Sequence, residues 1–267
     1  MPWHALTLQV DRASAEAFSD ALLEAGAQSV ALEPDGAVVA ILSLEQDSHA
    51  VISAAALAAG ISAPRFSSEQ LDDQDWVRKT QAQFQPTLIG ERLWIGPTWH
   101  SPPAGRVAVR IDPGLAFGTG THPSTKLVLA WLETTIRGGE RVLDYGCGSG
   151  ILGIAAAKLG AAHVDGVDLD PQAVETAAAN ARANGVAMNA ALPDALAAGH
   201  YDVVVSNILA QPLILLAPLL AARGRRLALS GILDEQAEEV ARAYEPWLSM
   251  KLGDREEGWV LLEGTRR

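Results

Sequence analysis

The sequence is poor in cysteine, in basic residues and in long uninterrupted apolar segments. Cys147 is the single cysteine among 267 residues, so no internal disulfide can form, and a reducing cytoplasm is the expected compartment. Lys and Arg number 20 against 32 Asp and Glu, which gives a formal net charge of −12. A chain with this negative net charge has no excess of basic residues to neutralise phosphate groups, so we expect no direct nucleic-acid partner.

The absence of a clean apolar run also argues against a membrane protein. The segment 203–222 carries no charge, but polar residues and prolines interrupt it, so it reads as a strand followed by a helix. The first residues lack a basic region leading into an apolar stretch, and we therefore expect no secretory signal. A monomeric protein without membrane or metal partners is the expectation.

Residues 1–70 differ from the rest of the chain in net charge and in the pattern of apolar residues. They hold nine acids and two bases, a balance of −7, and such a shift often marks a module boundary. Alternating and helical patterns follow in the order β-α-β-β-α-β, the ferredoxin-like α+β plan. The predicted strands cover Trp3–Val10, Ser29–Glu33, Val38–Leu44 and Pro64–Ser68, and the predicted helices cover Ala15–Ala25 and Ser48–Ala59. A turn at Pro34–Gly36 is predicted between the second and third strands.

The remaining chain predicts a linker over 71–104 and a second domain over 105–267. Asp72, Asp73 and Asp75 can start a short helix at Trp76 within the linker. In the second domain, apolar strands alternate with helical segments, which indicates a mostly parallel sheet covered on both faces. Near the end, Ser249–Leu252 and Trp259–Glu263 flank a polar turn at 253–258 and predict an antiparallel hairpin.

A glycine-rich turn gives the strongest local signal. The buried strand at Val142–Asp144 runs into Gly146, Gly148 and Gly150, and a helix follows. Glycines there let the backbone and the helix N–H groups approach a ligand closely. Asp168 stands at the end of the next strand, where a carboxylate can accept both hydroxyls of a ribose.

Two cofactor classes compete for this turn. Residues 148–153 match G-x-G-x-x-G, and Asp168 lies 20 residues after Gly148, as in dinucleotide-binding proteins. Asp144 favours the other class, because a carboxylate at the strand tip repels a pyrophosphate and attracts a cation. S-adenosylmethionine is cationic and carries no phosphate. The C-terminal hairpin also fits poorly with a second nicotinamide-binding half, so we favour S-adenosylmethionine over NAD.

The motifs together resemble one family closely. Asp144-x-Gly146-x-Gly148-x-Gly150 with Asp168 is similar to the class I S-adenosylmethionine-dependent methyltransferases, which have a Rossmann-like fold. Phe117–Thr125, Asp144–Leu152 and Asn207–Ala210, in that order, resemble the ribosomal protein L11 methyltransferases. The resemblance implies a ferredoxin-like recognition domain, a linker and a catalytic domain. It also implies methylation of lysine side chains and of the N-terminal amine of ribosomal protein L11.

The resemblance places cofactor contacts at Thr125, Gly146, Asp168 and Asn207. We add Asp144, Gly148 and Phe117 to this set. Asp168 would hold the ribose, although a helix cap is an alternative role for which Asp170 is better placed. Gly146 would lie under the methionine part of the cofactor. Cys147 reads as a small buried residue and not as a nucleophile.

The acceptor side of the site involves Asn207 and His122. Related amino-methyltransferases have a Pro-Pro-aromatic run after the residue at position 207, and Ile208–Ala210 replaces it here, which favours a tetrahedral amine over a planar nitrogen. Asn207 would position that amine, or alternatively cap a helix. His122 could relay a proton. Phe117–Thr125 would form a lid, or alternatively a plain loop in which Ser124 or Thr125 caps the next helix.

The expected chemistry is transfer of a methyl group from a sulfonium to a neutral amine, with orientation as the main contribution of the enzyme. The acidic first 70 residues suit a basic ribosomal protein, although an ordinary solvated surface could carry the same charge. Three alternatives remain: a methyltransferase with another substrate, a nicotinamide oxidoreductase, and a non-catalytic acidic scaffold for ribosome assembly.

Overall fold

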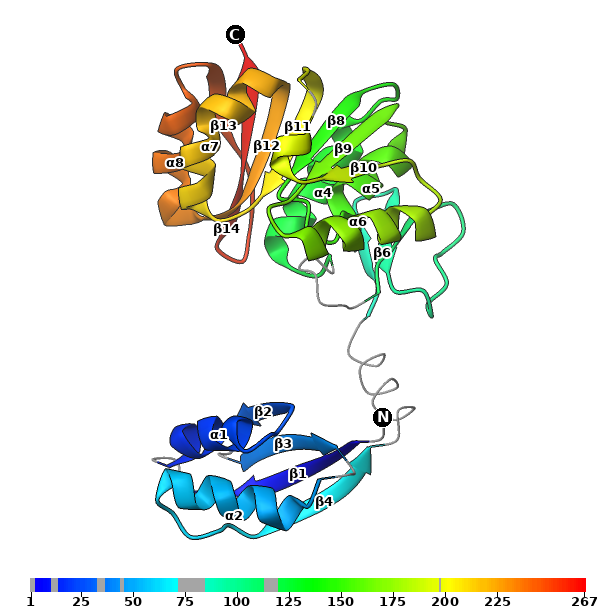
Figure 1. The fold of residues 1–267 in the computed structure, drawn as a ribbon. Coiled ribbons are helices and arrows are strands. Elements are labelled where there is room, and N and C mark those ends of the chain that lie inside the picture. Colours follow the sequence, from blue (N-terminus) through cyan, green and yellow to red (C-terminus); the bar gives the residue numbers. More distant parts are fainter. Residues whose placement is uncertain are drawn as a thin grey trace. The chain divides into compact units, whose positions relative to one another are not determined.

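The computed structural model describes residues 3–10, 14–32, 37–43, 46–71, 85–112, 120–196 and 198–267. The chain divides into two compact units, Met1–Gln83 and Phe84–Arg267, which are described separately here. Both are visible in Figure 1. The predicted short helix at Trp76 and the turn at 34–36 lie outside the described residues.

The first unit is a four-stranded sheet with two helices on one face. Its strands are β1 (Trp3–Gln9), β2 (Ser29–Leu32), β3 (Ala37–Ser43) and β4 (Phe66–Leu71), in the order β2-β3-β1-β4, and all neighbours are antiparallel. Helices α1 (Ala15–Glu24) and α2 (Ser48–Ala59) share one buried cluster with alternate residues of β1 and β3. This is the predicted ferredoxin-like arrangement of elements.

Local signals set the boundaries of α2. The Asp47 carboxylate accepts hydrogen bonds from the N–H groups of His49 and Ala50, and Gly60 ends the helix in the left-handed conformation. The predicted last strand is displaced: Pro64–Ser68 was expected, and β4 covers Phe66–Leu71. Propensity did not reveal this strand's position, because its register is set by pairing of Ala5 with Glu69 and Leu6 with Ser68.

The second unit contains a seven-stranded mixed sheet in the order β10-β9-β8-β11-β12-β14-β13. Its first five strands are mutually parallel, whereas β14 is antiparallel to β12 and β13 is antiparallel to β14. The strands are β8 (Arg141–Tyr145), β9 (His163–Val167), β10 (Asn189–Ala191), β11 (Tyr201–Asn207), β12 (Gly224–Leu233), β13 (Leu248–Glu256) and β14 (Trp259–Arg266). The helices are α4 (Pro123–Thr135), α5 (Ile151–Leu159), α6 (Pro171–Ala183), α7 (Ala210–Arg223) and α8 (Ala237–Tyr244), with short 3-10 turns at Pro193–Ala195 and Asp234–Gln236.

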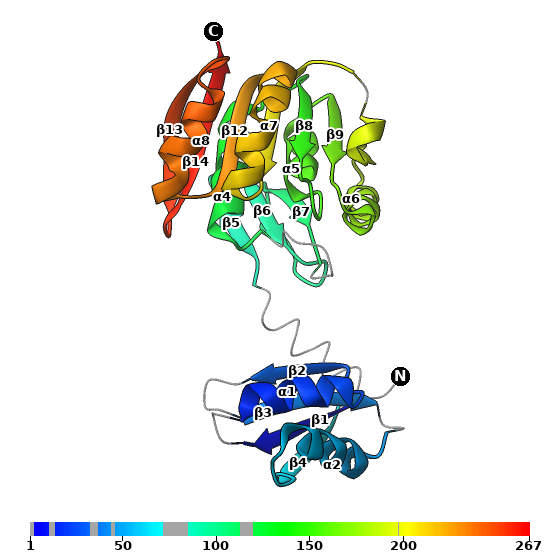
Figure 2. The same ribbon diagram turned by 60° about the vertical axis from the view of Figure 1, so that its left-hand side comes forward.

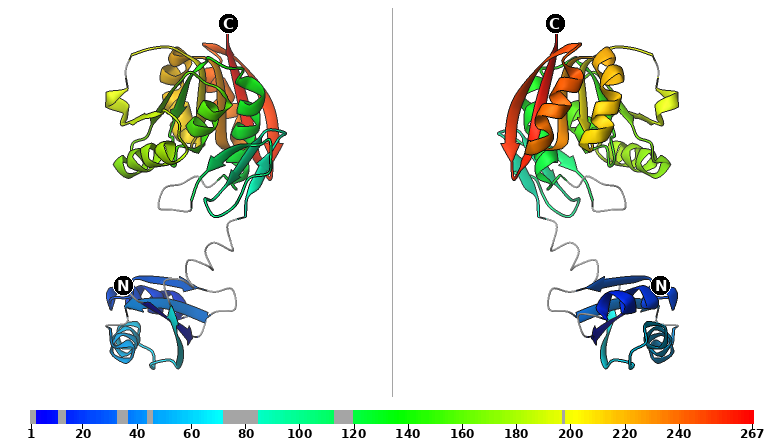
Figure 3. Two further views of the ribbon diagram at one scale, coloured as in Figure 1. Left: turned by 90° about the vertical axis from the view of Figure 1, so that its right-hand side faces the viewer. Right: turned by 90° about the vertical axis from the view of Figure 1, so that its left-hand side faces the viewer.

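Both faces of this sheet are covered, as the continuous apolar strands predict. On β11, Val203 and Val205 pack with α4 and α5, whereas Val204 between them packs with α7 and α8. Figure 2 brings the α7–α8 face forward, and Figure 3 shows the unit from two opposite sides. The period-2 alternation of strand side chains thus divides the core into two layers.

A small three-stranded sheet packs beside α4. It consists of β5 (Thr87–Ile89), β6 (Leu93–Gly96) and β7 (Val107–Arg110), with β5 antiparallel and β7 parallel to β6. The buried Glu133 carboxylate on α4 accepts hydrogen bonds from the N–H groups of Glu91 and Arg92, at 2.8 and 3.0 Å. Residues 85–104 of the expected 71–104 linker therefore belong to the second unit, and the linker itself stays a prediction.

The C-terminal hairpin is longer than predicted. Strands β13 and β14 run on to Glu256 and from Trp259, so Glu257 and Gly258 alone form the turn, in place of a six-residue loop. Both turn residues have positive φ, 49° and 83°, which is typical of the tight turns that match strand twist. None of the helices in the described part of the chain is long and apolar enough to cross a membrane.

Candidate active site

The candidate site lies where the parallel sheet changes its winding direction. The helix after β8, α5, packs on one face, and the helix after β11, α7, packs on the other. Crevices form between such strands at their carboxyl ends. The β8–β11 pairing ends at Asp144 and Val205, and the Ser206 hydroxyl then donates to the Tyr145 carbonyl at 2.7 Å.

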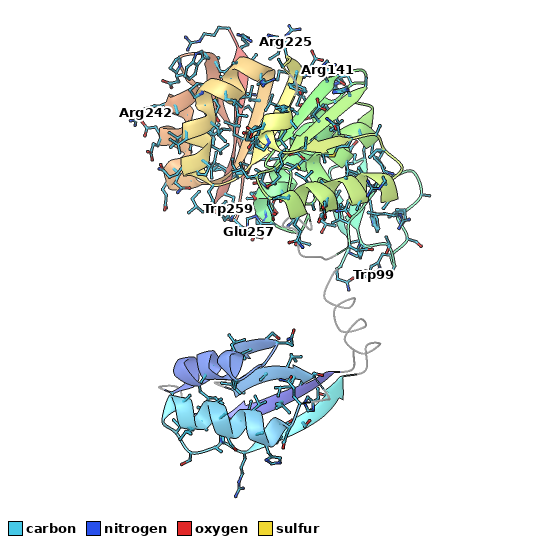
Figure 4. The ribbon with its side chains drawn as sticks, in the orientation of Figure 1. Trp99, Arg141, Arg225, Arg242, Glu257 and Trp259 are labelled. Atoms are coloured by element: carbon cyan, nitrogen blue, oxygen red, sulfur yellow. The ribbon has the colours of Figure 1, made fainter. Side chains whose placement is uncertain are left out.

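A cavity of about 540 Å³ occupies this crevice, a size suited to a small-molecule ligand. Its lining comes from the ends of β8, β9 and β11, from the start of α4, and from β12 and β14. Figure 4 labels Trp259, a lining residue, at this edge of the sheet and Arg141 at the opposite edge. The lining residues are His122, Ser124, Thr125, Tyr145, Gly146, Cys147, Gly148, Ile151, Leu152, Asp168, Leu169, Asn207, Ile208, Leu209, Pro212, Leu216, Gly231 and Trp259.

The glycine-rich turn forms the floor between β8 and β9. Gly146, Gly148 and Gly150 all have positive φ, at 79°, 52° and 80°, which L side chains rarely adopt. The N–H groups of Gly146 and Cys147 both donate to the Val167 carbonyl, at 2.7 and 2.9 Å. These bonds hold the turn against the end of β9, next to Asp168.

Asp168 is a half-buried pocket residue at the tip of β9. One carboxylate oxygen accepts the Gly148 N–H at 2.8 Å, and the other accepts the Asp170 N–H at 3.1 Å. Asp170 is the residue that caps α6, through a bond from the Gln172 N–H. The alternative role for Asp168 as a cap of that helix therefore falls to Asp170.

Asp144 lies behind the pocket and does not line it. The side chain is fully buried, Oδ2 accepts the Gly153 N–H at 2.9 Å, and Oδ1 has no partner among the described residues. Burial raises the pKa of Asp144 to about 7, the Gly153 N–H opposes this, and the Asp168 charge adds to it. With this pKa, Asp144 is only partly ionised near neutral pH.

Thr125 and Asn207 meet across the pocket from distant parts of the chain. The Asn207 amide donates to the Thr125 hydroxyl at 3.0 Å, and both residues line the cavity. The predicted alternative of a helix cap does not hold for Asn207, because α7 begins at Ala210 with Leu209 in the cap position. Asn207 is thus a pocket residue at the end of β11.

His122 has a structural position at the pocket wall. It caps α4, with Nδ1 accepting the Ser124 N–H at 3.3 Å. Its ring contacts Trp259 edge to face at a centroid distance of 4.8 Å. The sequence suggested Ser124 or Thr125 as the cap, and the helix begins earlier because Pro123 suits its first turn. A proton-relay role for His122 stays a prediction.

Cys147 is buried under the pocket. Burial and the nearby carboxylates of Asp144 and Asp168 raise the pKa of its thiol. Burial likewise raises the pKa of Tyr145, against the opposing charge of Arg223. Both groups are protonated at neutral pH, so Cys147 is no nucleophile here.

The cavity brings together six of the eight predicted site residues: His122, Thr125, Gly146, Gly148, Asp168 and Asn207. Asp144 stands behind them. Phe117 lies outside the described residues, as do Gly118 and Thr119 of the expected lid, whereas residues 120–125 are described. Sequence reasoning missed Leu169, Gly231 and Trp259. Leu169 directly follows Asp168 in the sequence, and this position beside a predicted ribose ligand is the signal that identifies it. Its side chain is 81% exposed. Gly231 and Trp259 reach the pocket only through sheet pairing.

Comparisons with known proteins agree on one family. The family model for ribosomal protein L11 methyltransferase matches residues 2–267. The ribosomal protein L11 methyltransferase of Thiobacillus denitrificans is 50% identical, and that of Cupriavidus metallidurans is 46% identical, with 100% of this chain and 100% and 97% of those proteins covered.

Solved structures agree in fold. The ribosomal protein L11 methylase of Lactobacillus delbrueckii subsp. bulgaricus has a TM-score of 0.62 and 33% identity, over 68% of this chain and 98% of that one. A methyltransferase from Pyrococcus furiosus, with a TM-score of 0.50 and 18% identity over 58% and 88% of the two chains, shares the fold. The large mixed sheet and the crevice at its β8–β11 switch are therefore those of a class I methyltransferase, and the chain belongs to the ribosomal protein L11 methyltransferase family.

Proposed function

We propose that this chain transfers methyl groups from S-adenosylmethionine to amino groups of ribosomal protein L11. The observation that carries the proposal is the composition of the pocket. Asp168 stands at its β9 side, and among the described residues that line the pocket none is Lys or Arg. A pocket of this kind can hold a ribose and a cation, but it offers no side-chain cation to a diphosphate.

The residues present fit S-adenosylmethionine. Asp168 would accept the ribose hydroxyls, and the exposed face of Leu169 would lie against the adenine. A Cβ on Gly146 would come within 2.3 Å of Ile208 Cγ2, so glycine keeps this part of the cradle open. The buried Asp144 Oδ1 has no partner among the described residues. A cation bound in front of it would favour the ionised form of Asp144, which would then add negative potential behind the positively charged methionine part.

Asn207 and Thr125 would position the acceptor nitrogen. When bound, the cofactor supplies a methyl group on a sulfonium. The hydrogen bond to Thr125 fixes the plane of the Asn207 amide, so its carbonyl oxygen can accept from an amine held in line with that methyl group. The apolar wall from Ile208, Leu209 and Pro212 excludes water from the amine.

The pocket supplies no evident dedicated base, and the proposal requires none. A free lysine has a pKa of about 10.4, and desolvation against the apolar wall lowers it. Methylation then needs only the neutral fraction of the amine. We infer that the rate rises with pH through the neutral range when chemistry limits turnover. A flat profile under those conditions would contradict amine deprotonation.

Lysine side chains and the N-terminal amine are the proposed acceptors. Ile208–Ala210 provides no aromatic face for a planar nitrogen, which supports a tetrahedral amine. The first 70 residues, with their balance of −7, would favour the approach of a basic ribosomal protein by long-range attraction. We propose the first unit as the recognition module.

Tritiated-methyl transfer into purified ribosomal proteins tests the function. We expect label in L11, on lysine and N-terminal amines after peptide mapping, and none without the enzyme. Label in a different protein would support another methyltransferase of the same fold. Failure to bind S-adenosylmethionine at all would instead favour a scaffold.

A further inference from the structure

The edge of the large sheet opposite the pocket carries an unusual concentration of arginines. Parallel strands have their amino ends at one edge and their carboxyl ends at the other. Arg141 begins β8, Arg225 and Arg226 follow the first residue of β12, and Arg266 ends the antiparallel β14. Figure 4 shows Arg141 and Arg225 at this edge, away from Trp259.

Strand pairing makes these arginines neighbours. Tyr201 pairs with Gly224, Arg226 pairs with Thr265, and Leu248 of β13 pairs with Arg266. Trp247, which immediately precedes β13, is 42% exposed. We call Arg141, Arg225, Arg226, Arg266 and Trp247 the arginine edge. Together these residues occupy the ends of neighbouring strands from β8 to β13.

The positive charge of the arginine edge is only partly compensated. Arg226 interacts electrostatically with Glu140 and donates to the Thr135 carbonyl at 3.4 Å, and the Arg141 guanidinium lies over the Tyr201 ring. Among the described residues, none of its four guanidinium groups forms an ion pair with a carboxylate, whereas Arg242 and Arg255 elsewhere pair with Glu238 and Asp234. The nearby carboxylates accept hydrogen bonds from backbone N–H groups. Glu140 accepts the N–H groups of Arg137 and Gly138, and Asp202 accepts that of Arg141. Uncompensated like charges on adjacent strands are destabilising, so a bound anion would offset them.

The geometry suits an extended polyanion. Arg225, Arg226 and Arg266 line a cavity of about 340 Å³ together with Asp202 and Thr265. Four inter-strand steps from β8 to β13 span about 19 Å at roughly 4.8 Å each, a length that one phosphate ion cannot bridge. An exposed tryptophan at the end of this row adds a flat surface on which a base can stack.

We propose that the arginine edge binds single-stranded nucleic acid, through backbone phosphates on the four arginines and a stacked base on Trp247. The net charge of −12 describes the chain as a whole and not this edge. The proposed function, which involves a ribosomal protein, makes RNA the natural source. Binding itself requires no methyl transfer, so failure of either proposal leaves the other standing.

Fluorescence anisotropy of the full chain with a labelled single-stranded RNA, and with a DNA of the same sequence, tests the proposal. Each phosphate neutralised contributes a slope of about −0.7 in log K against log salt, so four contacts predict roughly 50-fold weaker binding at 200 than at 50 mM salt. Tighter binding of RNA than of DNA would show that the arginine edge prefers RNA. Equal binding of the two would show that it recognises the phosphate backbone that both share.

Two double variants distinguish an effect of the arginine edge from an effect of the net charge of the chain. Arg225→Gln with Arg266→Gln should weaken binding at low salt about tenfold or more and halve the salt slope. Arg242→Gln with Arg255→Gln changes the net charge equally and should leave both unchanged. Trp247→Leu should lose about tenfold in affinity at an unchanged slope, and Trp247→Phe should restore it. Equal losses in the two arginine pairs, or a wild-type chain without salt-dependent binding, would overturn the proposal.

Discussion

The Asn207 amide donates a hydrogen bond to the Thr125 hydroxyl at 3.0 Å across 82 residues of sequence. The bond joins the end of β11 to the first turn of α4, on the side of the pocket where we place the acceptor amine. Asn207→Ala should lower kcat about fivefold or more, because one positioning hydrogen bond contributes roughly 1 kcal/mol or more to a transition state. Steady-state methylation kinetics measure this.

Thr125→Val supplies the matched partner for a double-mutant cycle. Because the two side chains act as a unit, the double variant should lose little more than Asn207→Ala alone. Strictly additive losses would show that the two residues work independently, and an Asn207→Ala enzyme with intact turnover would remove Asn207 from amine positioning altogether.

Asp168 and Asp170 form a matched pair for testing cofactor contact. Asp168→Ala should weaken S-adenosylmethionine binding roughly 100-fold, because two hydrogen bonds to a charged acceptor are lost at about 1.5 kcal/mol each. Asp170→Ala removes the cap of α6 and should cost about 1 kcal/mol of folding stability with little change in affinity. Calorimetric titration separates the two effects, and an unchanged Kd for Asp168→Ala would exclude the ribose contact.

Gly146 and Gly139 test the close approach in the cradle. Both have positive φ, 79° and 93°, but a Cβ at Gly146 would lie 2.3 Å from Ile208 Cγ2, whereas a Cβ at Gly139 would meet nothing within 4 Å. Each alanine variant should lose about 1–2 kcal/mol from backbone strain. Only Gly146→Ala should lose cofactor affinity and more stability. Thermal melting and binding curves measure this, and equal behaviour of the two variants would contradict the packing argument.

The raised pKa of Asp144 predicts that the free energy of unfolding depends on pH. Its pKa is about 7 in the folded chain against 3.8 as the ordinary value, so the folded state binds more protons between these values. The free energy of unfolding therefore falls as pH rises from about 4 to about 7 on account of this group. Asp144→Asn should abolish that slope and gain stability relative to wild type above pH 7. Denaturant titrations at several pH values measure it.

Asp165 serves as a control for Asp144, because the pKa of Asp165 is shifted in the opposite direction. Burial would raise its pKa, but hydrogen bonds from Tyr201, Asn189 and His163 outweigh burial and lower it. Its stabilisation is therefore present above its unfolded pKa and is lost as pH falls. Asp165→Asn should destabilise the chain at neutral pH. If both variants shifted the pH profile in the same direction, the assigned environments would be wrong.

Much of the fold is predictable from the sequence because local patterns and burial agree. The strands around Val142, Val203 and Leu227 are apolar and lie between helical segments, so a covered parallel sheet follows. The pairing of β5, β6 and β7 into one sheet escaped prediction. Its turn depends on the carboxylate of Glu133, more than forty residues away in the chain, and no local pattern reveals such a bond.

The residues of the candidate site likewise divide into those that the sequence predicts and those that it does not. Gly146, Gly148 and Asp168 follow strands directly, and their meeting results from parallel strands ending at one edge. Trp259 and Gly231 reach the pocket through the antiparallel hairpin and its register. The distinction between Asp144 behind the pocket and Asp168 within it also needs coordinates, because both follow apolar strand residues in the sequence.

The central claim is that this pocket accepts a cationic methyl donor and rejects a diphosphate. Calorimetric titration of S-adenosylmethionine and of NAD into the wild-type chain at neutral pH tests it most directly. We expect saturable one-site binding of S-adenosylmethionine and no heat of binding with NAD. Tight binding of NAD, or no binding of S-adenosylmethionine by the folded chain, would contradict it.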